Sequence, residues 1–231
     1  MKIALLGAEC TGKTRLSVEM ARQLETQGLI VRVVPEVLRQ WCQRECRTPL
    51  HNEQHAIARE QAHRVNSIAA CDIVICDTTP LMTAIYSEAL FNDRSIFGFA
   101  LEHHAVYDMT LVMGLDLPWI ADGHQRDGPH SQEPIDALLR NTLGSAAIPY
   151  VTVYGQHANR CENALTILSS FKKTTLATPS HQIRNQRITE TSRVWRCDKC
   201  DDASCEHHIF QELIPPLTEV AGCRASDGLG Q

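Results

Sequence analysis

The chain has 231 residues, of which 43% are hydrophobic, 21% charged and 5% aromatic. This length suits one ordinary domain with a modest appendage, and the composition excludes disordered, collagenous and fibrous proteins. The formal net charge of −5 argues against a general nucleic-acid-binding surface, which carries an excess of Lys and Arg. Since no uninterrupted run of about 18 apolar residues occurs, we also expect no membrane span.

Short apolar runs alternate with helical patterns from the amino terminus onward. The strands predicted by this alternation cover residues 2–6, 29–34, 72–76, 109–113 and 150–153. The predicted helices cover residues 14–28, 51–70, 80–90, 99–106, 134–143 and 157–171. Because such alternation implies right-handed crossovers, it predicts an α/β fold: a five-stranded parallel sheet with helices on both faces. We assign this core to residues 1–171.

The segment after the first predicted strand fits the phosphate-binding pattern G-x-x-x-x-G-K-[ST]. Glycines in such a loop let backbone N–H groups converge on phosphate oxygens, and the helix that follows directs its positive end at the anion. Lys13 would contact the β- and γ-phosphates, and the Thr14 hydroxyl would ligate Mg²⁺. The alternative is a glycine-rich turn without a ligand. The motif predicts a P-loop NTPase that binds a nucleoside triphosphate through Gly7, Glu9, Cys10, Thr11, Gly12, Lys13 and Thr14.

Two acidic residues lie where predicted strands end, which is where ligands gather in parallel sheets. Glu36 follows the second strand, and Asp77 follows the third. A carboxylate at this edge could take the proton of an acceptor hydroxyl or hold Mg²⁺. The alternatives are a solvated loop charge for Glu36 and a helix N-cap for Asp77, which begins the sequence Asp-Thr-Thr-Pro.

Several later segments differ from the core in composition. Residues 115–133 are rich in Asp, Gly, Pro and His and are too long for a plain connection, which indicates a lid. Residues 172–192 are polar and show little periodicity, so we expect a linker there. Residues 216–231 are expected to form a flexible tail.

The phosphate loop, together with four further segments, resembles the ribosylnicotinamide kinase family, the P-loop kinase domain of bacterial regulators of NAD synthesis. The segments are PEVLRQW at 35–41, CDTT at 76–79 with Thr83 and Tyr86 on the turns that follow, Tyr107-Asp108, and PWIADGHQR at 118–126. The resemblance covers residues 1–171. It implies that the protein phosphorylates the ribose 5′-hydroxyl of nicotinamide riboside with ATP and Mg²⁺, giving nicotinamide mononucleotide.

The resemblance also implies roles for individual residues. Lys13 and Thr14 would hold phosphate and metal, Asp77 would support Mg²⁺, and Arg126 on the lid would neutralise the transferred phosphoryl group. Glu36 would bind ribose hydroxyls or act as the base. The small-molecule nucleoside would be bound by Glu36, Arg39, Trp119 and Asp122. Trp119 would either stack on the pyridinium ring or anchor the lid.

Some features leave the function open. Cys10 stands where the family's loop is expected to have serine, which puts a thiol beside the phosphates. Another small-nucleoside kinase fits the same motifs, and so does a regulatory ATP-binding switch.

Residues 193–215 contain three cysteines and two histidines within a short, turn-rich segment. A Cys-x₂-Cys pair, a third Cys and one His make a tetrahedral set for a structural Zn²⁺ ion, and the alternative is a reduced tail without metal. The predicted ligands are Cys197, Cys200 and Cys205 with either His207 or His208. This segment is also a candidate for binding a protein partner.

The remaining scattered cysteines indicate a reducing compartment. Cys42, Cys46, Cys71, Cys76 and Cys161 fall in apolar or helical segments, where a reduced thiol packs as a small hydrophobic group. The apolar stretch before Gly7 is too short for the core of a signal peptide. We therefore expect a cytoplasmic protein.

Overall fold

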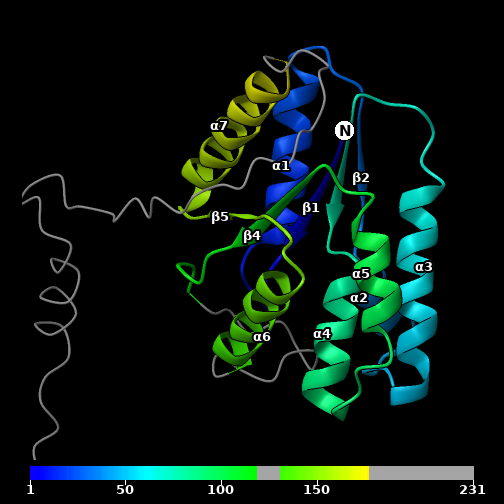
Figure 1. Ribbon diagram of the computed structural model, residues 1–231. Coiled ribbons are helices and arrows are strands. Elements are labelled where there is room, and N and C mark those ends of the chain that lie inside the picture. Colours follow the sequence, from blue (N-terminus) through cyan, green and yellow to red (C-terminus); the bar gives the residue numbers. More distant parts are fainter. Residues whose placement is uncertain (119–130, 177–231) are drawn as a thin grey trace, which may run out of the picture. The chain divides into compact units, whose positions relative to one another are not determined.

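The computed structural model describes residues 1–118 and 131–176, with side chains as far as Phe171. Within this part, five parallel strands form one sheet in the order β2-β3-β1-β4-β5 (Figure 1). The strands are β1 (Lys2–Leu6), β2 (Val31–Val34), β3 (Ile73–Asp77), β4 (Met109–Met113) and β5 (Val151–Val153). The helices are α1 (Lys13–Glu25), α2 (Val37–Glu45), η1 (His51–Glu53, a 3₁₀ turn), α3 (Gln54–Asn66), α4 (Pro80–Phe91), α5 (Phe97–His104), α6 (Gln132–Ser145) and α7 (His157–Leu176). The predicted α/β fold with a five-stranded parallel sheet is confirmed.

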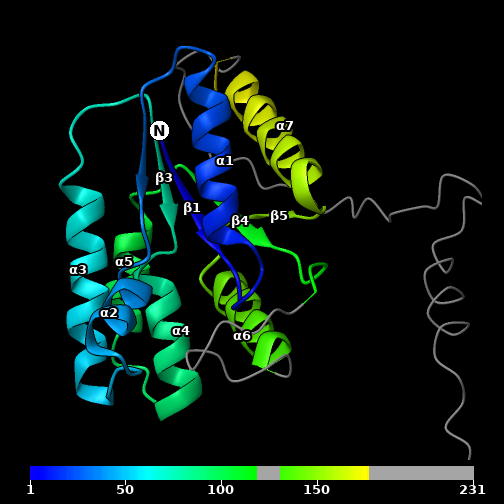
Figure 2. The same cartoon turned by 180° about the vertical axis from the view of Figure 1, so that it is seen from behind.

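Strand β1 lies in the middle of the sheet, and its side chains alternate between two separate cores. Ile3 and Leu5 pack in the cluster that includes residues of α1 and α7. Leu6 packs in the cluster that includes residues of α4 and α6. The two clusters lie on opposite faces because successive strand side chains point to opposite sides. Figures 1 and 2 show α1 and α7 together on one face of the sheet, and α3, α4 and α6 on the other.

The order of the strands brings the candidate residues to one edge. From β1 the chain crosses to β2 at one end of the sheet, while β4 pairs with β1 on the opposite side. In parallel sheets, ligands bind beside such a change of direction, outside the carboxyl ends of the strands. The phosphate loop leaves β1 at this edge, Glu36 follows β2, and Asp77 ends β3.

The structure differs from the sequence prediction in several elements. Helix α2 is not predicted by the sequence, since only Val37 and Cys42 of its residues are buried and they form no regular apolar stripe. Helix α3 ends at Asn66, before the predicted end at residue 70, whereas α7 continues beyond Phe171 to Leu176, into the start of the expected linker.

The six cysteines in the described part of the chain are all free thiols. Cys42, Cys76 and Cys161 are buried and Cys71 is half-buried. The expectation of a packed thiol is wrong for Cys46, which is exposed at the C-cap of α2 with φ 53°. No helix of the described ranges combines the length and the apolarity that a membrane-spanning helix needs.

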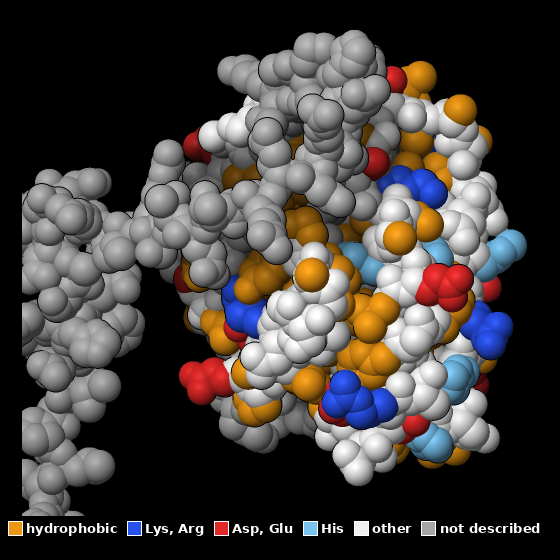
Figure 3. Space-filling model, viewed as in Figure 1, with side chains coloured by type: hydrophobic (Ala, Val, Ile, Leu, Met, Phe, Trp, Pro, Cys, Tyr) orange, Lys and Arg blue, Asp and Glu red, His pale blue; other side chains and the backbone are white. Residues whose placement is uncertain are grey.

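The basic side chains visible on one face of the molecule do not gather into a patch. Figure 3 shows Lys and Arg side chains standing apart from one another among acidic and hydrophobic ones on the described part of this face. The described part of this face therefore offers no broad basic surface, in keeping with the negative net charge of the chain.

Candidate active site

The loop between β1 and α1 closes around the side chain of Lys13. The Lys13 ammonium donates hydrogen bonds to the carbonyl oxygens of Gly7 and Ala8, each at 2.8 Å. The Thr11 hydroxyl also donates to the Ala8 carbonyl, at 2.8 Å. Lys13 is only 7% exposed. The loop thus holds a buried positive charge at the start of α1, where the helix dipole also favours an anion.

Two glycines make this loop geometry possible. Gly12 has φ +81°, in the left-handed region that side chains rarely adopt. Gly7 has φ +149°, and a Cβ atom built there would lie 2.9 Å from the Cβ of Met113 on β4. The P-loop pattern therefore places glycine at the two positions where the backbone requires it.

The other predicted loop residues lie on the same turn. Cys10 lines the neighbouring cavity and has φ 57°, a positive value in a residue other than glycine. The Glu9 carbonyl accepts a hydrogen bond from the Gln132 side chain at 2.7 Å, which ties the loop to the start of α6.

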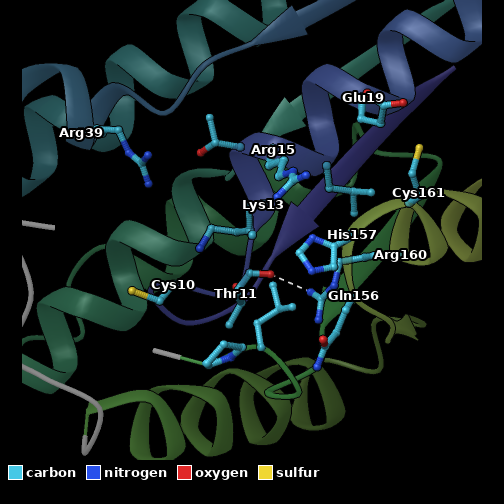
Figure 4. Close-up of a pocket in the computed structure, with 16 residues that line it drawn as sticks. Cys10, Thr11, Lys13, Arg15, Glu19, Arg39, Gln156, His157, Arg160 and Cys161 are labelled. Carbon is cyan, nitrogen blue, oxygen red and sulfur yellow. Dashed lines mark hydrogen bonds between the residues drawn. The ribbon is translucent and has the colours of Figure 1, made fainter. Parts of the chain in front are cut away.

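Glu36 lies at the N-terminus of α2, facing the same edge of the sheet. Its carboxylate is 12% exposed and pairs with the Arg39 Nε atom at 3.3 Å. Burial raises the pKa of Glu36, while the Lys13 ammonium opposes this shift. The structure thus excludes a solvated loop charge. Figure 4 shows Lys13 and Arg39 reaching from α1 and α2 toward the same space.

Burial lowers the pKa of Lys13, and the carboxylates of Glu36 and Asp77 partly offset this shift. Each of the two carboxylates is therefore close enough to interact electrostatically with the ammonium group. Three charged groups predicted from separate segments of the sequence share one electrostatic environment. Such coupling between buried titratable groups is typical of functional sites.

Asp77 is buried at the end of β3, with 2% of its surface exposed. The N-cap of α4 is Thr79, whose Oγ1 atom accepts a hydrogen bond from the Leu81 amide at 3.2 Å, so the alternative of an Asp77 cap is wrong. The Asp77 Oδ1 atom is buried and has no hydrogen-bond partner among the described residues. Within the same part of the chain, the buried Thr14 Oγ1 atom also lacks a partner. Since Mg²⁺ takes hard oxygen ligands of these types, Thr14 and Asp77 fit the expected metal.

A cavity of about 660 Å³ opens beside the phosphate loop (Figure 4). Its walls come from the start of α1, the residues after β4 and the loop between β5 and α7, and they include Gly12, Thr14, Arg15, Leu117, Gln156 and His157. This volume lies within the range of about 300–1,000 Å³ that small-molecule sites occupy. The cavity is therefore large enough for a nucleotide whose phosphates lie in the loop.

Arg160 of α7 holds three parts of the cavity wall together. Its guanidinium donates to the Thr11 carbonyl of the phosphate loop at 2.6 Å and to the Gly155 carbonyl at 2.7 Å. It also pairs with the carboxylate of Asp116, just after β4, which in turn accepts from the Gly155 amide at 2.7 Å. Burial lowers the pKa of Arg160, and Asp116 opposes this shift.

Sequence reasoning missed the residues that the β5–α7 segment contributes, namely Gln156, His157 and Arg160. No local pattern distinguishes them from ordinary polar residues at a helix start. Conversely, the predicted site residues Trp119, Asp122 and Arg126 lie outside the described residues, as do Cys197, Cys200, Cys205, His207 and His208. Their roles stay predictions.

Residues 2–160 match the family model described as the AAA domain. The chain belongs to this family. No curated protein matches the chain by sequence. The family assignment rests on the match to residues 2–160, which make up most of the chain.

Solved structures with a similar fold include two of the NadR protein and one of a deoxyadenosine kinase. NadR in complex with NAD and AMP-PNP has a TM-score of 0.60 and 17% identity, over 82% of this chain and 51% of that chain. NadR in complex with NR has a TM-score of 0.60 and 17% identity, over 80% of this chain and 52% of that chain. Deoxyadenosine kinase from M. mycoides, with products dcmp and a flexible dcdp bound, has a TM-score of 0.54 and 14% identity, over 74% of this chain and 100% of that chain.

These likenesses establish that the AAA domain has the P-loop kinase fold. The chain spans about half the length of the NadR proteins that it matches. Fold alone does not name a reaction, since one fold serves many activities.

Proposed function

We propose that this AAA domain is an ATP-dependent kinase that phosphorylates the ribose 5′-hydroxyl of nicotinamide riboside, giving nicotinamide mononucleotide. The observation that carries the proposal is the convergence of the Lys13 ammonium with the half-buried carboxylate of Glu36 and the buried carboxylate of Asp77, beside a cavity of nucleotide size. The resemblance of residues 35–41 and 118–126 to the ribosylnicotinamide kinase family supports the choice of acceptor. The fold shared with NadR, one of whose structures holds NR, also supports it.

In this proposal the phosphate loop and Lys13 bind the β- and γ-phosphates of ATP. Thr14 and Asp77 hold Mg²⁺, which neutralises phosphate charge when it is bound. The nucleotide base and ribose occupy the cavity beside Arg15, Gln156 and His157. The buried Arg160 keeps the cavity wall attached to the loop.

Glu36 lies on the acceptor side of the phosphates, where its carboxylate accepts the proton of the attacking hydroxyl. Its raised pKa makes the Glu36 carboxylate a stronger base than an exposed glutamate. The Arg39 guanidinium lowers the same pKa and so favours the ionised form that a base needs. Asp77 is less suited to this task because its free oxygen is needed beside Thr14 for the metal. Trp119, Asp122 and Arg126 complete the acceptor site in this proposal, in the roles that the family resemblance implies.

One observation favours an alternative acceptor, a nucleoside other than nicotinamide riboside. The chain matches the whole length of the M. mycoides deoxyadenosine kinase, whereas it matches only half of NadR. A small nucleoside other than nicotinamide riboside would use the same phosphate loop and the same carboxylates.

A panel of nucleosides incubated with ATP and Mg²⁺, scored by the mass of each product, decides between these acceptors. The proposal expects nicotinamide riboside to give the mononucleotide at the highest kcat/KM. The Glu36→Gln variant is expected to lose at least 10-fold in kcat with little change in ATP affinity, because general bases contribute about 10²–10⁴-fold. Preferential phosphorylation of a deoxynucleoside would replace the proposed acceptor with the alternative one.

A further inference from the structure

The N-terminus of α2 is capped by a residue from another helix. Glu36 occupies the N-cap position of α2, yet its side chain makes no capping hydrogen bond. The first amide groups of a helix have no partner within the helix, and the N-cap side chain ordinarily supplies one. Glu36 instead directs its carboxylate to Arg39.

Gln61 of α3 supplies the missing partner. Its Oε1 atom accepts a hydrogen bond from the Val37 amide at 2.8 Å, and its Nε2 atom donates to the Pro35 carbonyl at 3.4 Å, the weaker of the two bonds. Gln61 is 1% exposed. One buried amide group therefore bridges the residues on either side of Glu36.

This bridge fixes the backbone from which the Glu36 carboxylate projects. Pro35 has a restricted φ angle, and Val37 is buried as the first residue of α2, so the backbone is constrained on both sides of Glu36. The amide must present its oxygen to Val37 and its nitrogen to Pro35, so a single orientation satisfies both bonds. Gln61 thus satisfies the first amide of α2, while the Glu36 carboxylate pairs with Arg39.

We propose that Gln61 is a positioning residue for Glu36. By binding the first amide of α2 and the Pro35 carbonyl, Gln61 holds the backbone of Glu36 so that its carboxylate faces the acceptor. The inference rests on the proposed role of Glu36 in phosphorylation. It extends the acceptor site to a residue that has no direct contact with the substrate.

Gln61→Met tests the inference, because methionine has a similar length and neither accepts nor donates these bonds. We expect kcat/KM for the acceptor to fall ~10- to 100-fold, the loss that a small misplacement of a reacting group causes, while KM for ATP stays within about 2-fold. Gln61→Glu provides a second variant, which keeps an acceptor for the Val37 amide and loses the donor to Pro35. Its added charge near Glu36 is expected to move the acidic limb of the kcat/KM profile to higher pH.

Val65→Ala is the matched control for stability. Val65 lies one turn further along α3, is 1% exposed and packs with Val34, Val74 and Cys76. The smaller side chain lowers the melting temperature without removing a bond at the start of α2. If Gln61→Met and Val65→Ala lower the melting temperature alike and both keep the acceptor kcat/KM of the parent chain, Gln61 only stabilises the fold and the inference is overturned.

A readout independent of turnover separates the inference from the proposed function. The titration of the Glu36 carboxyl carbon, followed by ¹³C NMR, is expected to shift to lower pH in Gln61→Met, because a carboxylate that is no longer held in place loses part of the burial that raises its pKa. An unchanged Glu36 titration would overturn the inference. Absence of any phosphorylated product with the parent chain would instead overturn the proposed function, and the titration would still decide the role of Gln61.

Discussion

Replacing Lys13 with methionine should separate catalysis from folding. The ammonium lies inside the loop, hydrogen-bonded to the carbonyls of Gly7 and Ala8, and its burial lowers the pKa. The fold therefore bears a desolvation cost to keep this charge. Methionine removes that cost together with two hydrogen bonds, each worth ~1.5–3 kcal/mol when the donor is charged. Because the two changes oppose each other, we expect the free energy of unfolding to shift by no more than ~2 kcal/mol.

The expected loss of activity is much larger. A unit charge ~4 Å from the transferred phosphoryl group contributes ~4 kcal/mol at an effective dielectric constant of ~20. Its loss corresponds to a decrease of about 1,000-fold in kcat/KM for ATP, because the ammonium contacts the phosphates both in bound ATP and in the transition state. Product formation by mass spectrometry and thermal melting by circular dichroism measure the two effects. Arg44→Met, which removes an exposed cation paired with Glu45, is the control and should leave kcat unchanged.

A Lys13→Met variant that keeps its kcat/KM for ATP within 10-fold of the parent chain would refute the assignment of Lys13 to the phosphates. A variant that unfolds at room temperature would refute the expected balance between desolvation and hydrogen bonding.

Three further predictions concern other parts of the chain. Arg160→Gln should raise KM for ATP ~10-fold with little effect on acceptor KM, since it detaches the cavity wall from the Thr11 carbonyl. A KM for ATP equal to that of the parent chain would contradict this. His104 is buried, and desolvation, reinforced by His103, lowers its pKa from 6.5 to about 4. As the pH falls, this imidazole therefore takes up a proton in the unfolded chain before it does so in the folded one. The free energy of unfolding should fall by ~3 kcal/mol between about pH 6.5 and about pH 4. Urea unfolding of His104→Gln should show a weaker pH dependence. Metal analysis of the purified full chain should give about one zinc per chain if the predicted carboxyl-terminal cluster binds it, and less than a tenth would refute that prediction.

The part of the site that could be predicted is the part encoded locally. The phosphate loop needs glycine where φ is positive and a lysine at a fixed spacing, so the pattern itself contains the geometry. Glu36 and Asp77 could be found because parallel strands deliver their carboxyl ends to one edge of the sheet. The sequence could not show whether Asp77 caps α4, because Thr79 also fits that role and only the fold decides between them.

The residues that sequence reasoning missed act over long separations. Gln61 is 24 residues from the Val37 amide that it caps, and Arg160 is 149 residues from the Thr11 carbonyl that it binds. Each is a polar residue in a helix, and its partner is defined only when the helix packs. The same reason explains why α2 could not be predicted, since it has only two buried residues, Val37 and Cys42, and packs against α3, a helix from a later part of the chain.

The stoichiometry of the products tests the central claim most directly. The parent chain is incubated with ATP, Mg²⁺ and nicotinamide riboside, and ADP, inorganic phosphate and nicotinamide mononucleotide are each quantified. A kinase that uses Lys13, Glu36 and Asp77 as proposed should release ADP and mononucleotide in equal amounts and depend on the riboside. Release of ADP with inorganic phosphate at the same rate with and without the riboside would contradict the account.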